Sequence, residues 1–512
     1  MYSTVPAALL AAFLSTVAVR PAGAADVSAA QADTLQLRMQ SWLSGVLGPD
    51  SSPTSPAVQV RPEGDHYRIE LPLGTPRAGE PSPVTLFTSA RPIEDGRWLF
   101  ESPAIPSPTH FTLGMPALAK NGKAPGPNIP VEITIETKGG RTSRGIFDPS
   151  FATPSTLSSS SRDGQIRAQS ALFDQLTKVE RSSSTSTLRP SGANRVDFMD
   201  EVTFEGYTLT SRSQDAPPLD LSAQQIRITG GIIDLSRDRA ATMIPAVARV
   251  ASSFVAELSS PGSIPAAGPS VDPQLLRTIL QSLKDLASEF TLNETFDGVA
   301  YRSETSNGAV NQLRIGMGAK SESGLLQASM DLGFDGLVLS DPALGAMAGL
   351  LPTKVALRPV LTGVSTDQAL RWLDAMGDAM GDARKGTRPP DFATLSQRAD
   401  VSAGLESFAV DVGGASFSGN GKLTTVSGGG LAGQAQITAS NFDDLIARVN
   451  AVPELAGVLP AFIFAKGISQ TVEGRLVWNL AYRDAKLLVN GTDLSAMTGH
   501  PPVKGNPGPK NR

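Results

Sequence analysis

Cysteine is absent from this chain of 512 residues, which excludes disulfides, thiolate catalysis and cysteine-ligated metal sites. Only three histidines are present, and this excludes most histidine-rich metal chemistry. Charged residues make up 18%, below the roughly 25% of an average soluble domain. The formal net charge of −5, with both signs intermixed, excludes a strongly basic nucleic-acid binder, so no nucleic-acid partner is expected.

Glycine and proline are abundant, with 49 and 39 residues. This excess favours many turns and short strands over a helical bundle. The length alone predicts about three domains.

The N-terminus carries the clearest targeting signal. Residues 5–19 are uncharged and apolar or small, and Ala22 and Ala24 are the small residues that a signal peptidase requires. A retained anchor is the weaker interpretation, because fifteen helical residues span only about 22 Å. We therefore expect residues 1–24 to be a signal peptide cleaved after Ala24, and the protein to be periplasmic.

No later stretch reaches 18 uninterrupted apolar residues, and the longest, 455–465, contains Pro460. The mature chain is therefore expected to have no transmembrane segment, although peripheral membrane contact is compatible with it.

The apolar periodicity predicts an α+β protein dominated by long, curved antiparallel sheets, with a few amphipathic helices packed on one face. The expected domains are residues 25–154, a helix with β-hairpins, and 155–498, a β-rich body. A disordered polar tail, 499–512, is expected to follow. Helices are expected at 29–47, 239–258, 273–290, 366–380, 441–450 and 454–465. Strands are expected at 58–60, 67–73, 84–90, 97–100, 131–135, 195–210, 225–235, 291–304, 309–319, 325–339, 354–360, 405–412, 416–426, 431–440, 470–480 and 484–489, with a proline-rich connection at 101–130.

The serine-rich region 155–195 allows two interpretations. Its composition is typical of a disordered linker. Apolar residues between the serines, such as Ile166, Leu176 and Val179, favour a half-buried segment instead.

An internal similarity relates residues 325–351 to residues 431–459. Both read as a strand, then Phe-Asp-x-Leu, then a small apolar helix and Leu-Pro. Two copies do not establish a repeat architecture, but they suggest two similar strand-then-helix units at about 291–390 and 400–495.

Few catalytic arrangements can be built from this sequence. Each of His66, His110 and His500 is expected to be a solvated surface residue. Walker, nucleophile-elbow, zinc-protease and EF-hand motifs are missing. The glycine runs at 413–414 and 428–430 are interpreted as hairpin turns or bulges. No catalytic, cofactor-binding or metal-binding residues are therefore assigned, and no cofactor is expected.

Adjacent acids leave one enzymatic alternative. The pairs Glu94-Asp95, Asp200-Glu201 and Asp443-Asp444 could belong to a glycosidase-type carboxylate pair, although acids in turns and at helix starts are usually solvated or capping groups.

The chain resembles a family of proteobacterial exported proteins, the domain-of-unknown-function family 2125. The resemblance rests on the exported start, the helix 35–47 with Trp42, the strand 65–73, the turn 145–155 and the C-terminal run 421–490. It implies a β-rich periplasmic protein and assigns no catalytic residue.

Together these observations predict a non-enzymatic, exported protein that binds a lipid-like or polypeptide ligand in an apolar groove and serves envelope maintenance. The groove is expected between the strands 325–339 and 431–440 and the helices that follow them. An envelope hydrolase and a structural partner in an envelope complex are the alternatives.

The targeting signal makes a direct prediction about processing. N-terminal sequencing of the exported protein should give Ala25, or the next residue, as its first residue. An intact Met1 would contradict cleavage.

Overall fold

The computed structural model describes residues 27–47, 58–72, 85–93, 97–102, 108–115, 129–138, 141–148, 153–213, 217–240, 242–243, 278, 285–381, 401–426, 430–484 and 486–494. Contacts divide the chain into two compact units. The first comprises the described residues within Met1–Glu304 and Leu370–Pro390, and the second those within Thr305–Ala369 and Asp391–Arg512. The predicted boundary at 154/155 lies inside the first unit.

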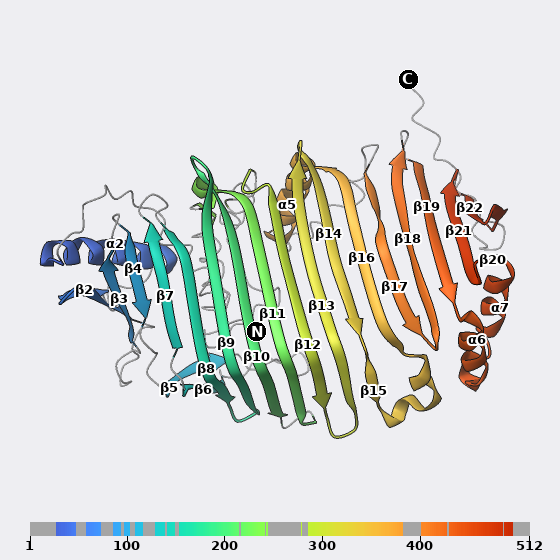
Figure 1. Ribbon diagram of the computed structural model, residues 1–512, viewed down its shortest axis with the longest axis horizontal. Coiled ribbons are helices and arrows are strands. Elements are labelled where there is room, and N and C mark those ends of the chain that lie inside the picture. The colour runs from blue at the N-terminus through green and yellow to red at the C-terminus, as the bar shows by residue number, and fades with distance from the viewer. Residues whose placement is uncertain are drawn as a thin grey trace. The chain divides into compact units, whose positions relative to one another are not determined.

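Antiparallel strands dominate both units, which confirms the predicted fold class (Figure 1). The first unit has the strand order β1-β2-β3-β4-β7-β8-β9-β10-β11-β12, and the short pair β5–β6 joins β8 through β6. Its elements are α2 (Ala29–Leu47), β1 (Gln59–Glu63), β2 (His66–Pro72), β3 (Thr85–Pro92), β4 (Trp98–Ser102), β5 (Thr109–Met115), β6 (Ile129–Thr137), β7 (Arg141–Asp148), β8 (Thr153–Gln169), β9 (Phe173–Gly192), β10 (Arg195–Ser213), β11 (Leu219–Ser236) and β12 (Glu289–Arg302).

The second unit has the order β13-β14-β16-β17-β18-β19-β21-β22-β23, with β15 paired to β13 and β20 to β21. Its elements are β13 (Asn307–Glu322), β14 (Leu325–Asp335), β15 (Val338–Ser340), the 3-10 helix η2 (Pro342–Leu350), β16 (Pro352–Ser365), β17 (Ser402–Val412), β18 (Ala415–Val426), β19 (Gly430–Ser440), α6 (Phe442–Asn450), η5 (Pro453–Leu455), α7 (Leu459–Gly467), β20 (Gln470–Val472), β21 (Arg475–Arg483), β22 (Lys486–Val489) and β23 (Thr492–Asp493). The helix α5 (Thr366–Gly381) begins in this unit.

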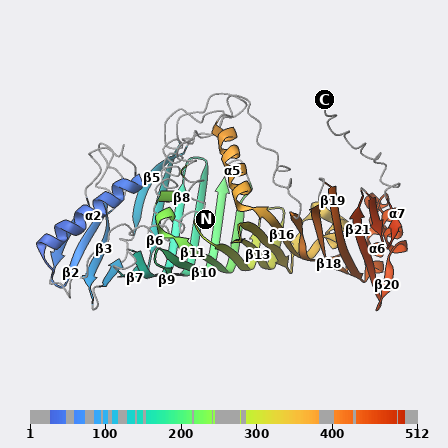
Figure 2. The same cartoon turned by 90° about the horizontal axis from the view of Figure 1, so that it is seen from above.

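The helix predicted at 29–47 is present as α2, which crosses the strands at one end of the first unit's sheet near β2 and β3 (Figure 2) and contacts β1. Buried Ala32 packs there with Val58, Tyr67 and Ile69. The helix also protects the sheet edge, because the Gln40 Oε1 accepts from the Val58 backbone N–H at 2.7 Å. The Gln36 Oε1 accepts from the Val60 N–H at 3.1 Å. Polar side chains of α2 thus satisfy donors that an edge strand would otherwise expose to pairing with another chain.

The serine-rich region is ordered as the long strands β8 and β9, so the linker interpretation was wrong. Ser158 to Ser161 lie opposite Thr185 to Ser182. Their hydroxyl groups bond across the strands, with 2.7 Å between the Oγ atoms of Ser161 and Ser182. Cross-strand hydroxyl pairs stabilise a sheet although their composition suggests disorder.

Other sequence expectations need correction. The strand β5 lies inside the expected connection 101–130, and β7 includes Gly145 and Asp148, which were expected in a turn. The strand expected at 470–480 is a hairpin, β20 and β21, turning at Glu473 and Gly474. The helix expected at 273–290 does not reach its predicted end, because β12 starts at Glu289; of residues 273–284, only Thr278 is described, and it is helical. The helix expected at 239–258 starts at 237 and lies mostly outside the described residues.

The long strands of the first unit share an irregularity at Gly206 in β10 and Gly298 in β12, both of which have a left-handed backbone. Apolar residues step by three across it, from Phe204 to Tyr207 in β10, and in β11 between the buried Ala223 and Ile226. In a regular strand, residues three apart point to opposite faces, so a spacing of three between inward residues means that the alternation is interrupted there, as it is in a β-bulge. The interruption occurs at the same position in β10 and β11, so their pairing register is the same before and after Gly206.

This arrangement predicts the cost of filling the glycine. Gly206→Ala should lower the free energy of unfolding by about 1–3 kcal/mol, because its Cβ adds strain at a φ of 61° and meets the Glu180 side chain. Gly324→Ala is the matched control, with a φ of 75° and no atom within 4 Å of the added Cβ, and should cost about 1 kcal/mol. Chemical denaturation measures both, and a smaller cost for Gly206→Ala than for Gly324→Ala would contradict the account.

Candidate apolar binding face

The second unit has one face of its sheet that is almost entirely apolar. Residues paired directly across antiparallel strands project to the same side, so the register assigns each side chain to a face. One row of partners contains Ile315, Leu332, Leu357, Phe408, Gly419, Ile437 and Trp478.

Two further rows lie on the same side, and the side of the sheet that carries these three rows is called the apolar face. The first contains Leu313, Phe334, Val355, Val410, Phe417, Ala439 and Leu476. The second contains Ala319, Ala328, Leu361, Ala403, Leu423, Gly433, Tyr482 and Leu487. The phenol of Tyr482 is the one polar side-chain group in the three rows.

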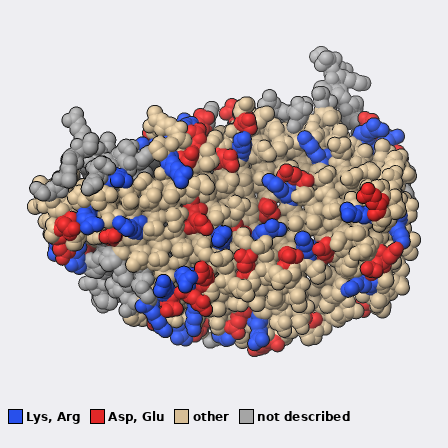
Figure 3. All heavy atoms as spheres, in the orientation of Figure 1, with Lys and Arg blue, Asp and Glu red and all other residues tan. Residues whose placement is uncertain are grey.

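The opposite side of the same strands is polar or small. A row between the apolar ones contains Gln312, Asp335, Lys354, Asp411, Ser416 and Ser440. Ion pairs lie on the surface there, such as Lys320 with Glu322 at 3.1 Å. Figure 3 shows charged side chains of both signs scattered over the face turned to the viewer. The division is the one that a half-buried antiparallel sheet requires.

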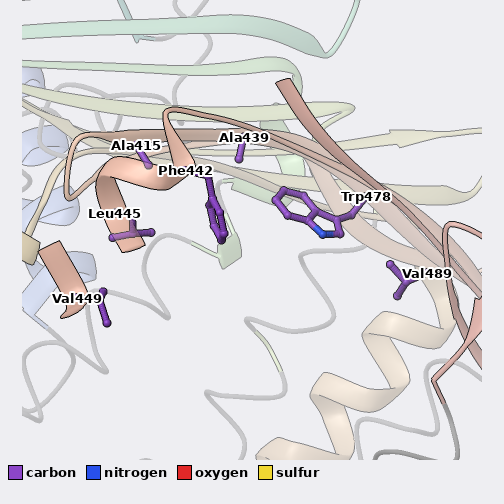
Figure 4. Close-up of a cluster of buried hydrophobic side chains, with 7 residues drawn as sticks. All are labelled: Ala415, Ala439, Phe442, Leu445, Val449, Trp478 and Val489. Atoms are coloured by element: carbon purple, nitrogen blue, oxygen red, sulfur yellow. The ribbon is translucent and has the colours of Figure 1, made fainter. Parts of the chain in front are cut away.

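Helices cover one end of the apolar face. Phe442, Leu445 and Val449 of α6 are buried against Ala415, Ala439, Trp478 and Val489 (Figure 4). The rings of Phe442 and Trp478 meet edge to face at 5.7 Å between centroids. The Trp478 Nε1 donates to the Ala465 carbonyl of α7 at 2.8 Å. This is the main buried cluster of the second unit.

Beyond this cluster, apolar side chains of the sheet stay accessible. The exposed fractions are 41% for Met317, 43% for Met330, 40% for Leu423 and 44% for Leu431. Met317 lies opposite Met330, and Leu431 lies opposite Thr425, two positions along β18 from Leu423. An apolar surface that continues outward from a buried core is typical of an interaction site rather than of scattered surface residues.

The expected groove strands are both part of this face. β14 and β19 carry its residues, but β16, β17 and β18 lie between them in the sheet. The segments after each strand do approach one another, since the Arg448 guanidinium of α6 donates to the Gly349 carbonyl of η2 at 3.5 Å. Each of β16, β17 and β18 shows the apolar–polar alternation of a half-buried strand. The sequence alone did not reveal that these three strands join β14 and β19 in one continuous apolar surface.

The two described histidines, His66 and His110, belong to the first unit. His66 is on β2 beside the buried Tyr67, and its ring contacts the Asp65 carboxylate at 3.2 Å. His110 is exposed on β5, and its ring nitrogen lies 3.0 Å from the Thr134 hydroxyl. This corrects its placement in a connection. His500 lies outside the described residues.

The acid pairs do not converge in the described part of the chain. Asp200 and Glu201 are successive residues of β10 and so point to opposite faces. Asp443 pairs with Lys466, and both Asp443 and Asp444 lie in the first turn of α6, where carboxylates stabilise a helix start. Glu94 and Asp95 are outside the described residues.

Other predicted features have clear positions. Gly413 and Gly414 form the turn between β17 and β18, as expected, whereas Gly428 and Gly429 are not described. Among the residues that the structure describes, no group of histidine or acidic side chains is arranged to hold a metal ion. Within the same residues, no helix has the length and apolarity needed to cross a membrane.

Comparisons with known proteins found no relative of this chain. No family model matches the chain, and neither a curated protein nor a solved structure does.

Two aspartates of the first unit have pKa values shifted in opposite directions. Burial raises the pKa of Asp200 above its ordinary value, although the Ser186 hydroxyl donates to it at 2.5 Å. The hydrogen bond from the Arg212 guanidinium lowers the pKa of Asp220. A carboxyl group whose pKa is raised by folding contributes stability at low pH, and that contribution is lost as the pH rises through its pKa in the folded protein. A carboxyl group whose pKa is lowered by folding contributes stability at neutral pH, and that contribution is lost as the pH falls.

The two shifts predict opposite pH dependence for matched variants. Asp200→Asn should gain stability relative to wild type as pH rises from about 3 to about 7, because the amide has no charge to desolvate. Asp220→Asn should lose stability over the same range. Denaturant unfolding at each pH measures the differences, and parallel curves for the two variants would contradict the assignment.

Proposed function

We propose that the protein is an exported, periplasmic, non-enzymatic binding protein that holds acyl chains on the apolar face of its second unit. The observation that carries the proposal is that face, on which three transverse rows contain one polar side-chain group and exposed members continue outward from the buried cluster. An envelope-maintenance role and the resemblance to family 2125 belong to the same proposal.

The chemistry of the face favours an acyl chain over a polypeptide. A peptide laid across the three rows would bury backbone N–H and C=O groups where, within those rows, only the Tyr482 hydroxyl offers a partner. An unsatisfied buried amide costs about 1–3 kcal/mol, which opposes the gain from its side chains. An acyl chain has no such groups along its length, and burial of each CH₂ contributes about 0.8 kcal/mol.

The hydrolase alternative finds less support among the described residues. Its acid pairs either point to opposite faces or form ion pairs at the surface, as the positions of Asp200, Glu201 and Asp443 illustrate. A structural partner that covers the apolar face with its own apolar surface is the stronger rival, and the binding experiment separates it.

Native mass spectrometry of protein isolated from its own envelope should show added mass in the lipid range. The purified protein should also take up a fluorescent fatty acid. A clean apo mass without uptake would favour the structural partner.

Substitutions on the two faces of the same strands test the location. Met330→Glu with Leu423→Glu should abolish uptake, because each places a charge on the apolar face at an exposed position. The matched control is Gln327→Glu with Lys422→Glu, whose side chains leave the other face of β14 and β18 and should retain uptake. Equal uptake by both double variants would place the ligand elsewhere.

A further inference from the structure

A second apolar surface lies at one end of the sheet of the second unit, where the segments after β14 and β19 emerge. Residues 455–465, which include most of α7, form a run without any charge. Leu459 and Phe462 of this run pack against the buried cluster around Phe442 and Trp478. Its other side is open, with Ile463 exposed by 57% and Phe464 by 41%.

The helix α7 therefore lacks the polar outer face of an ordinary surface helix. A helix that is apolar on all sides is normally buried in a protein core or in a membrane. When such a helix lies at the surface of a protein, its outward side is expected to contact another protein or a membrane. Val458, the residue before α7, is also exposed and extends the surface.

The 3-10 helix η2 has the same character. Its nine residues, Pro342–Leu350, carry no charge and none is buried, and Met347 is exposed by 44%. The Arg448 bond to the Gly349 carbonyl joins η2 to α6, and the Lys466 ammonium of α7 pairs with the Asp443 carboxylate of α6. Both members of the internal sequence similarity thus contribute an uncharged helical segment to the same end of the unit.

We propose that this surface, centred on Ile463 and Phe464 of α7, inserts into the headgroup region of a lipid bilayer, with η2 on the other side of α6. A stable protein interface needs about 20–30 residues a side, which is more than these short segments offer. Binding at a bilayer interface instead grows with the apolar area inserted, so a few apolar side chains give reversible membrane binding. The bilayer is therefore the partner that fits the surface.

The charges nearby decide which lipids it recognises. Residues 441–475 contain three basic side chains and four acidic ones, and the basic Lys466 is paired with Asp443. Binding by a basic cluster would require anionic lipid. This surface instead should bind zwitterionic phosphatidylcholine, which has no net charge, with little response to salt. The surface lies outside the acyl-binding face and does not require the proposed function.

Flotation of the full-length exported chain with phosphatidylcholine vesicles tests the proposal. Wild-type protein should float with the vesicles at low and at high salt. Ile463→Ser with Phe464→Ser should reduce the bound fraction at least about tenfold, because it removes most of the apolar area that enters the bilayer. The matched control, Met199→Ser with Leu219→Ser, removes exposed apolar side chains from the first unit and should float like wild type.

Two further measurements separate membrane docking from acyl binding and from oligomerisation. Fatty-acid uptake without vesicles should be unchanged in the Ile463/Phe464 variant, so that a failure of docking is distinguished from a failure of acyl binding. Size-exclusion chromatography should give the same oligomeric state for all variants. Wild-type protein that stays unbound, a variant that floats normally, or a wild-type dimer lost in the variant would each overturn the proposal.

Discussion

The antiparallel hydrogen-bond ladder is the constraint on which the rest of this structure depends. Its register places directly paired residues on one side of the sheet, so the alternation within each strand becomes continuous across many strands. In the second unit this aligns Ile315 with Leu332, Leu357 and Phe408 on one face, while Gln312 and Asp335 align on the other. A surface with two opposite chemistries follows directly, and the apolar one needs a cover or a ligand.

Helices meet that need only in part. In the first unit, α2 buries Tyr67 and Ile69 and its glutamines bond the outer edge of β1, so the helix covers a face and closes an edge at once. In the second, α6 and α7 bury Trp478 but leave Met317, Met330 and Leu423 accessible. The part of the apolar face that these helices leave uncovered is the proposed acyl-binding site. The exposed apolar side of α7 is the proposed membrane contact.

Sequence patterns predicted local elements well where burial follows a simple period. The helix at 29–47 and the strand β19 lie where their periods predict them. The strand expected at 325–339 ends at Asp335 as β14, because the chain turns at Gly336 into the separate strand β15. The sequence left β8 and β9 undecided between a linker and a half-buried segment, because serine pairs such as Ser161 and Ser182 stabilise strands through hydroxyl contacts that composition does not reveal. The prediction failed at 470–480, where the turn at Glu473 and Gly474 divides one apparent strand into two.

The sequence by itself determined which chemistries are excluded, which segments alternate and where apolar residues lie along each strand. Only the tertiary structure decided that the alternating strands share one register, and therefore that Leu313 and Leu476, more than 160 positions apart, lie on one apolar face. It also decided that Ile463 and Phe464 stay exposed while Phe462 packs inward. The physical reason is that face and burial are properties of paired strands and docked helices, which no segment possesses before it meets its partners.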